Sequence, residues 1–308
     1  MKNFLIIGGA GYIGSHLTGK LITENFKVHV IDIFKNNEKV FNSIISKKNL
    51  TVSNSNGHDL NKKDLKVFDV IIPLAALVGA PICDKYPSEA KSTNLELIKK
   101  ILKIASKSQE IIFPTTNSGY GSTSGNLKCN EKTPLNPISL YGKLKKEAEI
   151  EVMQRENSIS FRLATVFGVS PRHRTDLLVN DFVYKAYNEK CLVLFQENFK
   201  RNYIHLDDVA DAFIFASKKF NKLKRNIFNL GLSNANLTKK ELALKIKKYV
   251  KDLTIISSEI GDDPDKRNYI VDNTKFEKRG FKAKKTLEDG IQELIKYYSY
   301  QKRNDTNI

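Results

Sequence analysis

The sequence predicts an α/β fold, a Rossmann-type doubly wound parallel sheet with a smaller C-terminal lobe. Over the first half of the chain, short apolar runs alternate with longer amphipathic segments, which is typical of a parallel sheet covered by helices on both faces. A glycine-rich stretch follows the first apolar run and opens the first amphipathic segment. The chain has 308 residues, more than one compact core usually holds, which indicates a second lobe.

Strands are expected at short apolar or β-branched runs, at residues 4–7, 28–33, 70–74, 111–114 and 159–166. Helices are expected where apolar residues recur with helical spacing, at residues 12–24, 93–106, 139–156, 176–187, 207–218, 239–250 and 287–298. Residues 1–167 are predicted to form the Rossmann domain, and residues 168–200 and 232–308 the second lobe. Residues 201–205 are expected to return to the first sheet, so that residues 201–231 rejoin the first domain.

The formal net charge of +17 comes from lysines that are spread along the chain, including the helical segment 242–250. We find no helix-turn-helix, zinc-finger or RNA-binding motif, so nucleic acid is not expected as a partner. A basic surface instead favours an anionic substrate. No segment reaches the ~20 consecutive apolar residues that a membrane helix needs, so no membrane association is expected.

The start of the chain and its cysteines bear on location. Residues 1–7 run directly into the glycine-rich stretch without a cleavage site, so they are interpreted as a strand rather than a signal peptide. Cys83, Cys129 and Cys191 are few and odd in number, which argues against disulfides and predicts a cytoplasmic location. The histidines show no metal-ligand spacing with cysteines or carboxylates, so no metal is expected.

Residues 8–14, Gly-Gly-Ala-Gly-Tyr-Ile-Gly, form a G-x-x-G-x-x-G pattern between a strand and a helix. This context predicts a dinucleotide site, in which the glycines let the backbone approach a pyrophosphate at the helix N-terminus. A glycine-rich turn without a ligand is the alternative. Asp32, near the end of the second predicted strand, can bind ribose hydroxyls and would repel a 2′-phosphate, so NAD is predicted as the cofactor rather than NADP.

Three polar residues are candidates for catalysis. Tyr141 and Lys145 form a Tyr-x-x-x-Lys pattern at the start of the helix predicted at 139–156, and residues four apart share one helix face. An ammonium beside a phenol lowers the phenol's pKa and can also hold the nicotinamide ribose. Thr116 follows the buried strand 111–114, at the carboxyl end of the sheet, where α/β proteins bind their ligands.

The chain resembles the extended short-chain dehydrogenase/reductase family over nearly its whole length. Five features occur in that family's order: the glycine pattern, Asp32, Leu74-Ala75-Ala76, Thr116 and Tyr141-x-x-x-Lys145. The family contains nucleotide-sugar epimerases, dehydratases and dehydrogenases. The resemblance implies that Tyr141, as a phenolate, takes the proton of a sugar hydroxyl that Thr116 orients, while hydride passes to the nicotinamide.

The resemblance also implies which residues bind the cofactor and the substrate. The implied cofactor site consists of Gly8, Gly11, Tyr12, Ile13, Gly14, Asp32, Asp59, Leu60, Leu74, Ala75, Ala76, Asn94, Tyr141 and Lys145. The implied substrate site consists of Asn117, Ser118, Arg172, Arg174, Asn180, Arg201 and Arg267. Arginine suits a pyrophosphate because its planar guanidinium donates paired hydrogen bonds, although each arginine could instead be a surface charge.

Two departures from the family pattern narrow the reaction. Family dehydratases carry Asp-Glu directly after the catalytic threonine, whereas this chain carries Asn117 and Ser118, so the groups that eliminate water are missing. Gly119 stands where many members carry valine, which predicts room for a bulkier sugar. Some stretches resemble family enzymes that oxidise a GDP-linked heptose at C4 in capsule polysaccharide biosynthesis, which implies that substrate and reaction. These stretches are residues 73–81, 116–121, 161–182 and 262–273.

Other hypotheses stay open. A nucleoside-diphosphate-sugar 4-epimerase of the UDP-glucose type would use the same catalytic residues and NAD, so the motifs do not separate the two reactions. A non-enzymatic NAD-binding sensor is a third hypothesis, which the intact Tyr141 and Lys145 disfavour. Family members dimerise through helices that correspond to residues 93–106 and 139–156, which predicts a homodimer. The first of these has an apolar stripe, which can also simply face the core, formed by Leu95, Ile98, Ile101, Leu102 and Ala105.

Overall fold

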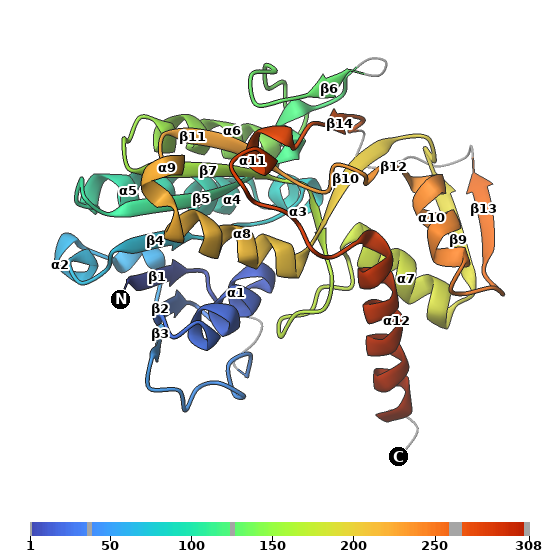
Figure 1. The fold of residues 1–308 in the computed structure, drawn as a ribbon, viewed down its shortest axis with the longest axis horizontal. Helices are drawn as coiled ribbons and strands as arrows, with labels where there is room; N and C mark the ends of the chain where they lie inside the picture. The colour runs from blue at the N-terminus through green and yellow to red at the C-terminus, as the bar shows by residue number, and fades with distance from the viewer. Residues whose placement is uncertain (1, 36–38, 124–126, 259–266, 305–308) are drawn as a thin grey trace.

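A seven-stranded parallel sheet forms the centre of the structure, a computed structural model that describes residues 2–35, 39–123, 127–258 and 267–304 (Figure 1). The strands are β1 (Asn3–Ile7), β2 (Lys27–Asp32), β3 (Leu50–Asn54), β4 (Val70–Pro73), β5 (Glu110–Thr116), β7 (Ser158–Leu163) and β11 (Asn226–Leu230). They lie in the order β11-β7-β5-β4-β1-β2-β3, and every neighbouring pair is parallel. The predicted α/β, Rossmann-type doubly wound fold is confirmed.

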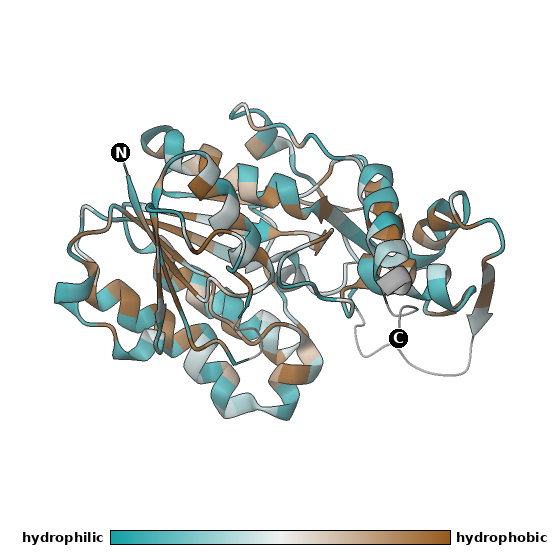
Figure 2. Ribbon diagram, turned by 90° about the horizontal axis from the view of Figure 1, so that it is seen from below, coloured by the Kyte–Doolittle hydropathy of each residue, from teal (hydrophilic) through white to brown (hydrophobic). Residues whose placement is uncertain are grey.

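Both faces of this sheet are buried beneath helices. Phe4 and Ile6 of β1 belong to one hydrophobic core, and the alternating residues Leu5 and Ile7 belong to another. The sheet strands are accordingly apolar on both sides, and Figure 2 shows them between helices that carry both hydrophilic and hydrophobic residues. The helices that contribute to these cores are α1 (Tyr12–Thr23) and α8 (Leu206–Lys218) on one face, and α5 (Leu97–Ile104) and α6 (Leu140–Met153) on the other.

A third core lies in the C-terminal half, away from the main sheet (Figure 1). It is built from α7 (Leu178–Asn188), α10 (Lys239–Lys247), α12 (Leu287–Asn304) and the parallel pair β9 (Cys191–Phe195) and β13 (Thr254–Ser258). The remaining elements are short: α2 (Lys62–Leu65), α3 (Ala80–Lys85), α4 (Pro87–Lys91), β6 (Lys128–Cys129), β8 (Thr165–Phe167), β10 (Lys200–His205), α9 (Phe220–Leu223), β12 (Asn236–Thr238), β14 (Ile270–Val271) and α11 (Thr274–Glu277).

Residues 201–205 do not return to the main sheet, so that expectation is wrong. They form β10, which pairs with β8 and β12 in a separate three-stranded sheet. The place beside β7 is taken by β11, with Phe228 opposite Phe161. Of the segment 201–231, β11 therefore joins the first sheet and α8 packs on it, whereas β10 does not join. The division of the chain into two domains stays a prediction.

The apolar stripe of the segment 93–106 faces the core. Leu95, Ile98 and Ile101 are each at most 2% exposed, packed in the core beneath α5 and α6. The stripe therefore supplies no evidence for a subunit interface, and the homodimer rests on the family resemblance alone. Among the described residues, no helix is long and apolar enough to cross a bilayer.

Candidate active site

The glycine-rich stretch forms a tight loop between β1 and α1. Gly8 has a φ of +81°, and a Cβ there would lie 2.4 Å from the backbone nitrogen of Ala75, so only glycine fits. A Cβ on Gly14 would lie 2.7 Å from Gly9, which lets α1 pack closely on the loop. Gly11 is the N-cap of α1 and has no side chain that could cap the helix. The backbone N–H groups in the first turn of α1 can therefore donate to a phosphate. The loop thus fits a dinucleotide pyrophosphate.

Asp32 lies at the end of β2, directly over this loop. Its carboxylate accepts hydrogen bonds from the backbone N–H groups of Ala10 and Phe34, both at 2.9 Å. These bonds fix the carboxylate beside the glycine loop, where it can accept from the hydroxyls of an adenosine ribose. Leu74 and Ala75 follow β4 on the other side, held by bonds of 2.7 Å from their N–H groups to the carbonyl of Ile7.

Three other predicted cofactor residues differ in the exposure of their side chains. Asp59 is exposed at the end of a 3-10 turn, Gly57–Asp59, and the Leu60 side chain is packed in the core. Asn94 is 1% exposed and holds the loop that follows β4, because its amide oxygen accepts from the N–H of Leu77 (2.8 Å) and its amide nitrogen donates to the Leu77 carbonyl (2.9 Å). Asn94 therefore shapes the wall of the site.

Tyr141 and Lys145 lie on the first two turns of α6, which begins at the N-cap Ser139. A Cβ on Gly142 would lie 3.4 Å from the Ser118 carbonyl oxygen, so the start of α6 packs on the turn that carries Thr116. Lys145 is 5% exposed, with its Nζ 4.2 Å from the ring centroid of Phe113. Burial lowers the pKa of Lys145 to about 7, an effect that the charge of a nearby glutamate opposes.

The charges that act on Tyr141 differ from those that the motif predicts. Burial raises the pKa of Tyr141 to about 12, while Arg267 and Arg174 lower it. The Cys83 thiol and Tyr269 act in the opposite direction. Neither Cys83 nor Tyr269 was assigned to the site from the sequence, because no motif connects them with Tyr141. Side chains from α3 and from the C-terminal part of the chain thus act electrostatically on the candidate catalytic phenol.

Thr116 ends β5 and caps the turn formed by residues Asn117–Tyr120. Its Oγ1 accepts from the N–H of Ser118 (3.1 Å) and lies 2.7 Å from the Ser118 hydroxyl. Arg267 donates to the same Ser118 hydroxyl. Asn117 is fully buried, and neither amide atom has a hydrogen-bond partner among the described residues. A buried amide without partners is rare in folded proteins, which suits a side chain that binds a ligand.

Gly119 does not open space for a larger sugar. A Cβ there would lie 3.3 Å from both methyl carbons of Leu135, so this side of the turn is already filled. The tyrosine that follows, Tyr120, is 1% exposed and donates to the carbonyl of Asn130 at 3.0 Å. The expectation that Gly119 leaves room is therefore wrong, because Leu135 occupies the place that a larger side chain would take.

The predicted substrate arginines are spread over several elements. Arg172 donates to the carbonyl of His173 (2.9 Å), and Arg174 is paired with Asp176. Arg201, on β10, is 2% exposed, with its guanidinium carbon 5.8 Å from the ring centroid of Tyr269. Of these arginines, Arg174 and Arg267 act on Tyr141, as described above. The residues 262–266, part of one segment that carried the resemblance, lie outside the described residues.

Asn180, predicted for the substrate site, makes hydrogen bonds within the protein. It is fully buried, its amide oxygen accepts from the N–H of Gly168 (3.1 Å), and its amide nitrogen donates to the Arg174 carbonyl (2.8 Å). The Tyr12 hydroxyl donates to the Gly168 carbonyl at 2.7 Å, and burial raises the pKa of Tyr12. Ser170 donates to the backbone of Tyr12 (2.7 Å). The first turn of α1 is thus tied to the loop that carries Arg172 and Arg174.

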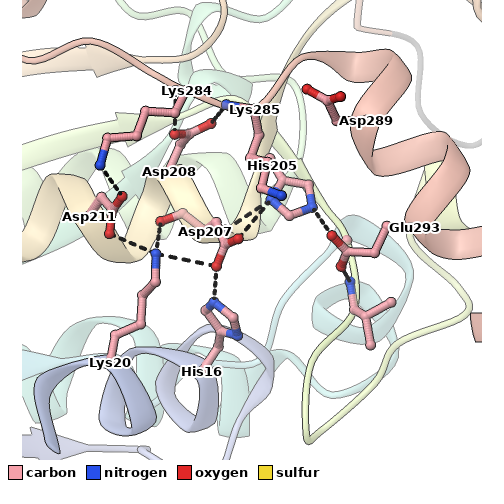
Figure 3. Close-up of polar contacts among 12 residues, drawn as sticks. His16, Lys20, His205, Asp207, Asp208, Asp211, Lys284, Lys285, Asp289 and Glu293 are labelled. Atoms are coloured by element: carbon pink, nitrogen blue, oxygen red, sulfur yellow. Dashed lines mark hydrogen bonds and ion pairs between the residues drawn. The ribbon is translucent and has the colours of Figure 1, made fainter. Parts of the chain in front are cut away.

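A charged network extends this link between α1 and the C-terminal half (Figure 3). His16 and Lys20 of α1 contact Asp207 of α8 at 2.7 and 3.3 Å, and these contacts hold the pKa of Asp207 well below its usual value. His205 lies 3.3 Å from Glu293 of α12, which accepts from the backbone of the loop after Gly168. The glycine-loop helix, the substrate-side loop and α12 are therefore joined by polar contacts.

Beneath the site lies a buried ion pair that the sequence did not reveal. Arg162 of β7 donates to Glu149 of α6 with Nη2–Oε1 at 2.7 Å, and the two side chains are 6% and 4% exposed. Thr115 and Ser160 also donate to Glu149, at 2.9 and 3.1 Å. Glu149 is one helical turn beyond Lys145, so the pair fixes the helix that carries the catalytic candidates. Among the described residues, no cluster of side chains suits a metal ion.

Comparison with known proteins gives a consistent result. The family model described as "NAD dependent epimerase/dehydratase family" matches residues 4–231. A putative UDP-glucose 4-epimerase of Methanocaldococcus jannaschii is 27% identical, over 97% of this chain and 99% of that protein. UDP-glucose 4-epimerase 2 of Arabidopsis thaliana is 23% identical, over 97% of this chain and 95% of that protein.

Two solved structures share the fold over the whole chain. The UDP-glucuronic acid 4-epimerase of Bacillus cereus, in complex with UDP-glucuronic acid and NAD, superposes with a TM-score of 0.85 and 21% identity, over 97% of this chain and 99% of that one. The dTDP-glucose 4,6-dehydratase of Bacillus anthracis, in complex with NAD, has a TM-score of 0.82 and 23% identity, over 98% of both chains.

Proposed function

Because this chain belongs to the NAD dependent epimerase/dehydratase family, we propose that it oxidises a nucleoside-diphosphate sugar at C4. It is an NAD-dependent enzyme of the extended short-chain dehydrogenase/reductase type, and a non-enzymatic sensor is not proposed. The observation that carries the proposal is the packing of the start of α6 on the turn after β5. This packing supports a site in which Tyr141 and Thr116 act together at the carboxyl end of the sheet, where α/β proteins bind their ligands.

Different residues of the chain have different roles in the proposed reaction. The N–H groups of the first turn of α1 bind the pyrophosphate of NAD, and Asp32 binds its adenosine ribose. When bound, NAD accepts the hydride from the sugar carbon. Tyr141 takes the proton of the C4 hydroxyl at its Oη, and Thr116 holds the same oxygen by a hydrogen bond. Lys145 supplies positive charge on the helix face of Tyr141 and a donor for the nicotinamide ribose.

Elimination of water is not proposed for this site. Asn117 and Ser118 occupy the positions at which family dehydratases carry an acid and a base, and neither side chain exchanges protons readily at neutral pH. The buried and unpartnered Asn117 amide instead suits a hydrogen bond to a sugar hydroxyl. The site therefore supports oxidation at C4 with Asn117 as a substrate contact.

The finer proposal is that the substrate is a GDP-linked heptose and that its 4-keto form feeds capsule polysaccharide biosynthesis. Its support is the likeness of residues 73–81, 116–121, 161–182 and 262–273 to enzymes of that kind. Arg172, Arg174, Asn180, Arg201 and Arg267 are proposed for the diphosphate side, with Asn180 acting through the loop that it holds. The net charge of +17 suits such an anionic substrate.

A 4-epimerase is the second candidate, and the relatives favour it. The Methanocaldococcus jannaschii and Arabidopsis thaliana proteins carry the name UDP-glucose 4-epimerase, and they match this chain over nearly its full length. An epimerase would return the hydride to the other face of the keto sugar, using the same Tyr141 and Thr116. The two reactions differ in whether the keto sugar leaves the site.

Absorbance of reduced nicotinamide separates the candidates. Purified protein with NAD is mixed separately with GDP-heptose, GDP-mannose and UDP-glucose, and the sugars are then analysed. We expect GDP-heptose to yield reduced cofactor together with a 4-keto sugar. An epimeric sugar without net reduction would favour the epimerase, and no turnover of any nucleotide sugar would overturn the proposed function.

The carboxylate of Asp32 should make the enzyme selective for NAD. Because two negative charges a few ångströms apart repel by several kcal/mol even at a protein surface, NAD should bind at least about tenfold more tightly than NADP. Asp32→Ser should remove most of this preference, measured by fluorescence titration with both reduced cofactors. Asp252→Asn, a change at an exposed carboxylate, serves as control. A wild-type protein that prefers NADP would contradict the assignment.

The cellular setting is also proposed rather than established. A cytoplasmic location is supported by the few cysteines, of which Cys83 and Cys129 are buried and form no disulfide among the described residues. A homodimer through the faces of α5 and α6 is proposed from the family resemblance. Neither proposal affects the chemistry of the site.

A further inference from the structure

A chain of hydrogen bonds leads from the C-terminal part of the protein to the catalytic threonine. Arg267 donates from its Nη1 to the Ser118 hydroxyl. The Ser118 hydroxyl lies 2.7 Å from Thr116 Oγ1, and the Ser118 N–H donates to the same Oγ1 at 3.1 Å. Ser118 is 3% exposed, so solvent does not compete for its hydroxyl.

The donors and acceptors in this series of hydrogen bonds follow from the chemistry of the three side chains. A guanidinium donates hydrogen bonds and cannot accept them, so the oxygen of Ser118 accepts from Arg267. Ser118 then has its own proton to place. Among the described residues, Thr116 Oγ1 is the acceptor within reach of that proton. The Ser118 hydroxyl therefore donates to Thr116, and the reverse direction would leave a buried hydroxyl proton without an acceptor.

Thr116 Oγ1 consequently accepts two hydrogen bonds, one from the Ser118 hydroxyl and one from the Ser118 N–H. A threonine hydroxyl has two lone pairs and one proton, so both of its acceptor positions are filled and its proton is left to donate. We propose that Ser118 and Arg267 are positioning residues that make Thr116 a hydrogen-bond donor to the sugar oxygen at C4. This inference rests on the proposed function and deepens it.

The direction matters for the reaction. When the sugar is oxidised, the C4 O–H bond breaks and its proton passes to Tyr141, the C4–H bond breaks and its electron pair passes with the hydrogen to NAD, and C=O forms. Negative charge develops on the sugar oxygen if its proton leaves before the hydride. A donor aimed at that oxygen stabilises this charge, whereas a threonine that accepted a bond from the sugar would favour the ground state.

The origin of Arg267 adds a consequence. Arg267 lies 149 residues beyond Ser118 in the sequence and just before β14. Arg267 also lowers the pKa of Tyr141. One guanidinium from the C-terminal part of the chain thus acts on Tyr141 directly and on Thr116 through Ser118, the two groups proposed to contact the sugar oxygen.

Ser118→Ala tests the inference, because it removes the hydroxyl that accepts from Arg267 and directs Thr116, and it leaves every arginine side chain proposed for the diphosphate unchanged. We expect kcat for the nucleotide sugar to fall about 10- to 100-fold, with little change in KM or in the affinity for NADH. Ser118→Thr, which keeps a hydroxyl, should restore most of kcat. Ser122→Ala, at an exposed serine four residues further on, serves as the matched control.

The same substitution in an enzyme that already lacks the Thr116 hydroxyl distinguishes a positioning role of Ser118 from a merely structural one. If Ser118 acts through Thr116, Ser118→Ala should cause no further loss in a Thr116→Val enzyme, measured in single-turnover absorbance experiments. Losses that multiply in the double variant, or a Ser118→Ala enzyme with wild-type kcat, would overturn the inference while leaving the proposed function intact. A wild-type enzyme that turns over no nucleotide sugar would overturn both.

Discussion

Tyr141→Phe is expected to lower kcat with a nucleotide sugar by about 10²- to 10⁴-fold while leaving NAD bound as before. The phenol oxygen is the proposed acceptor of the sugar proton, and removal of a general base typically has an effect of that size. The ring itself remains and keeps its packing against the core beneath α5 and α6. Cofactor binding is proposed to depend mainly on the glycine loop and on Asp32, which the substitution does not touch.

Two opposing influences set the pKa of Tyr141 in the ligand-free protein. Burial raises the pKa of Tyr141 to about 12, so the phenol is protonated at neutral pH in the ligand-free protein. Arg267 and Arg174 lower that pKa, and both are proposed to bind the substrate side. Their positive charges favour the phenolate, and a bound diphosphate would offset part of this effect. With a pKa of about 12, Tyr141 in the ligand-free protein should be a poor base.

Turnover is measured with the reduced-nicotinamide absorbance, and NADH affinity is measured by fluorescence titration. Tyr249→Phe, a loss of one hydroxyl at a tyrosine that is 41% exposed beyond α10, is the matched control and should keep wild-type turnover. Near-normal turnover in Tyr141→Phe would remove Tyr141 from its assigned role. Loss of NADH binding together with turnover would instead point to a structural defect.

Residues that are close in the sequence were the ones whose geometry could be predicted. The glycine pattern fixes its own loop, because Gly8 needs a positive φ and Gly14 needs close contact with Gly9. Residues four apart lie on the same face of an α-helix, so Tyr141 and Lys145 share one face of α6. Strand and helix periodicity likewise predicted a parallel sheet and five of its seven strands, and it missed β3 and β11.

Contacts between distant segments could not be read from local patterns. Nothing in the sequence shows that Arg267 reaches Ser118, because that contact depends on how the C-terminal segment packs. Residues 201–205 have the composition of a sheet strand, but the place beside β7 is filled by β11. Gly119 was expected to leave room for a larger sugar, but the Leu135 side chain packs against it. In each case the partner lies outside the local sequence pattern.

Arg162→Met should cause the largest loss of stability that a single substitution near the site produces. The guanidinium makes three contacts with the Glu149 carboxylate, between 2.7 and 3.2 Å, and both side chains are buried. Its removal leaves a carboxylate in a buried site whose remaining donors, among the residues that the structure describes, are the hydroxyls of Thr115 and Ser160. Breaking such a pair typically costs about 3–5 kcal/mol, because an uncompensated charge stays behind.

The loss is measured as the change in the free energy of unfolding in urea, with the apparent midpoint as the primary observable. Lys185→Met breaks a half-exposed pair with Asp181 on α7 and provides the control, with an expected change of at most about 0.5 kcal/mol. An Arg162→Met enzyme that is no less stable than this control would show that solvent or rearrangement compensates Glu149.

The double variant Arg162→Met/Glu149→Leu separates stability from function. Because no buried charge remains, it should regain much of the lost stability, and the two effects should be strongly non-additive. Activity should not return with it. Burial lowers the pKa of Lys145 to about 7, and the Glu149 charge opposes this, so without Glu149 a larger fraction of Lys145 is neutral at physiological pH. A neutral Lys145 cannot support the Tyr141 phenolate. A double variant that is stable and fully active would mean that the buried pair serves only the fold.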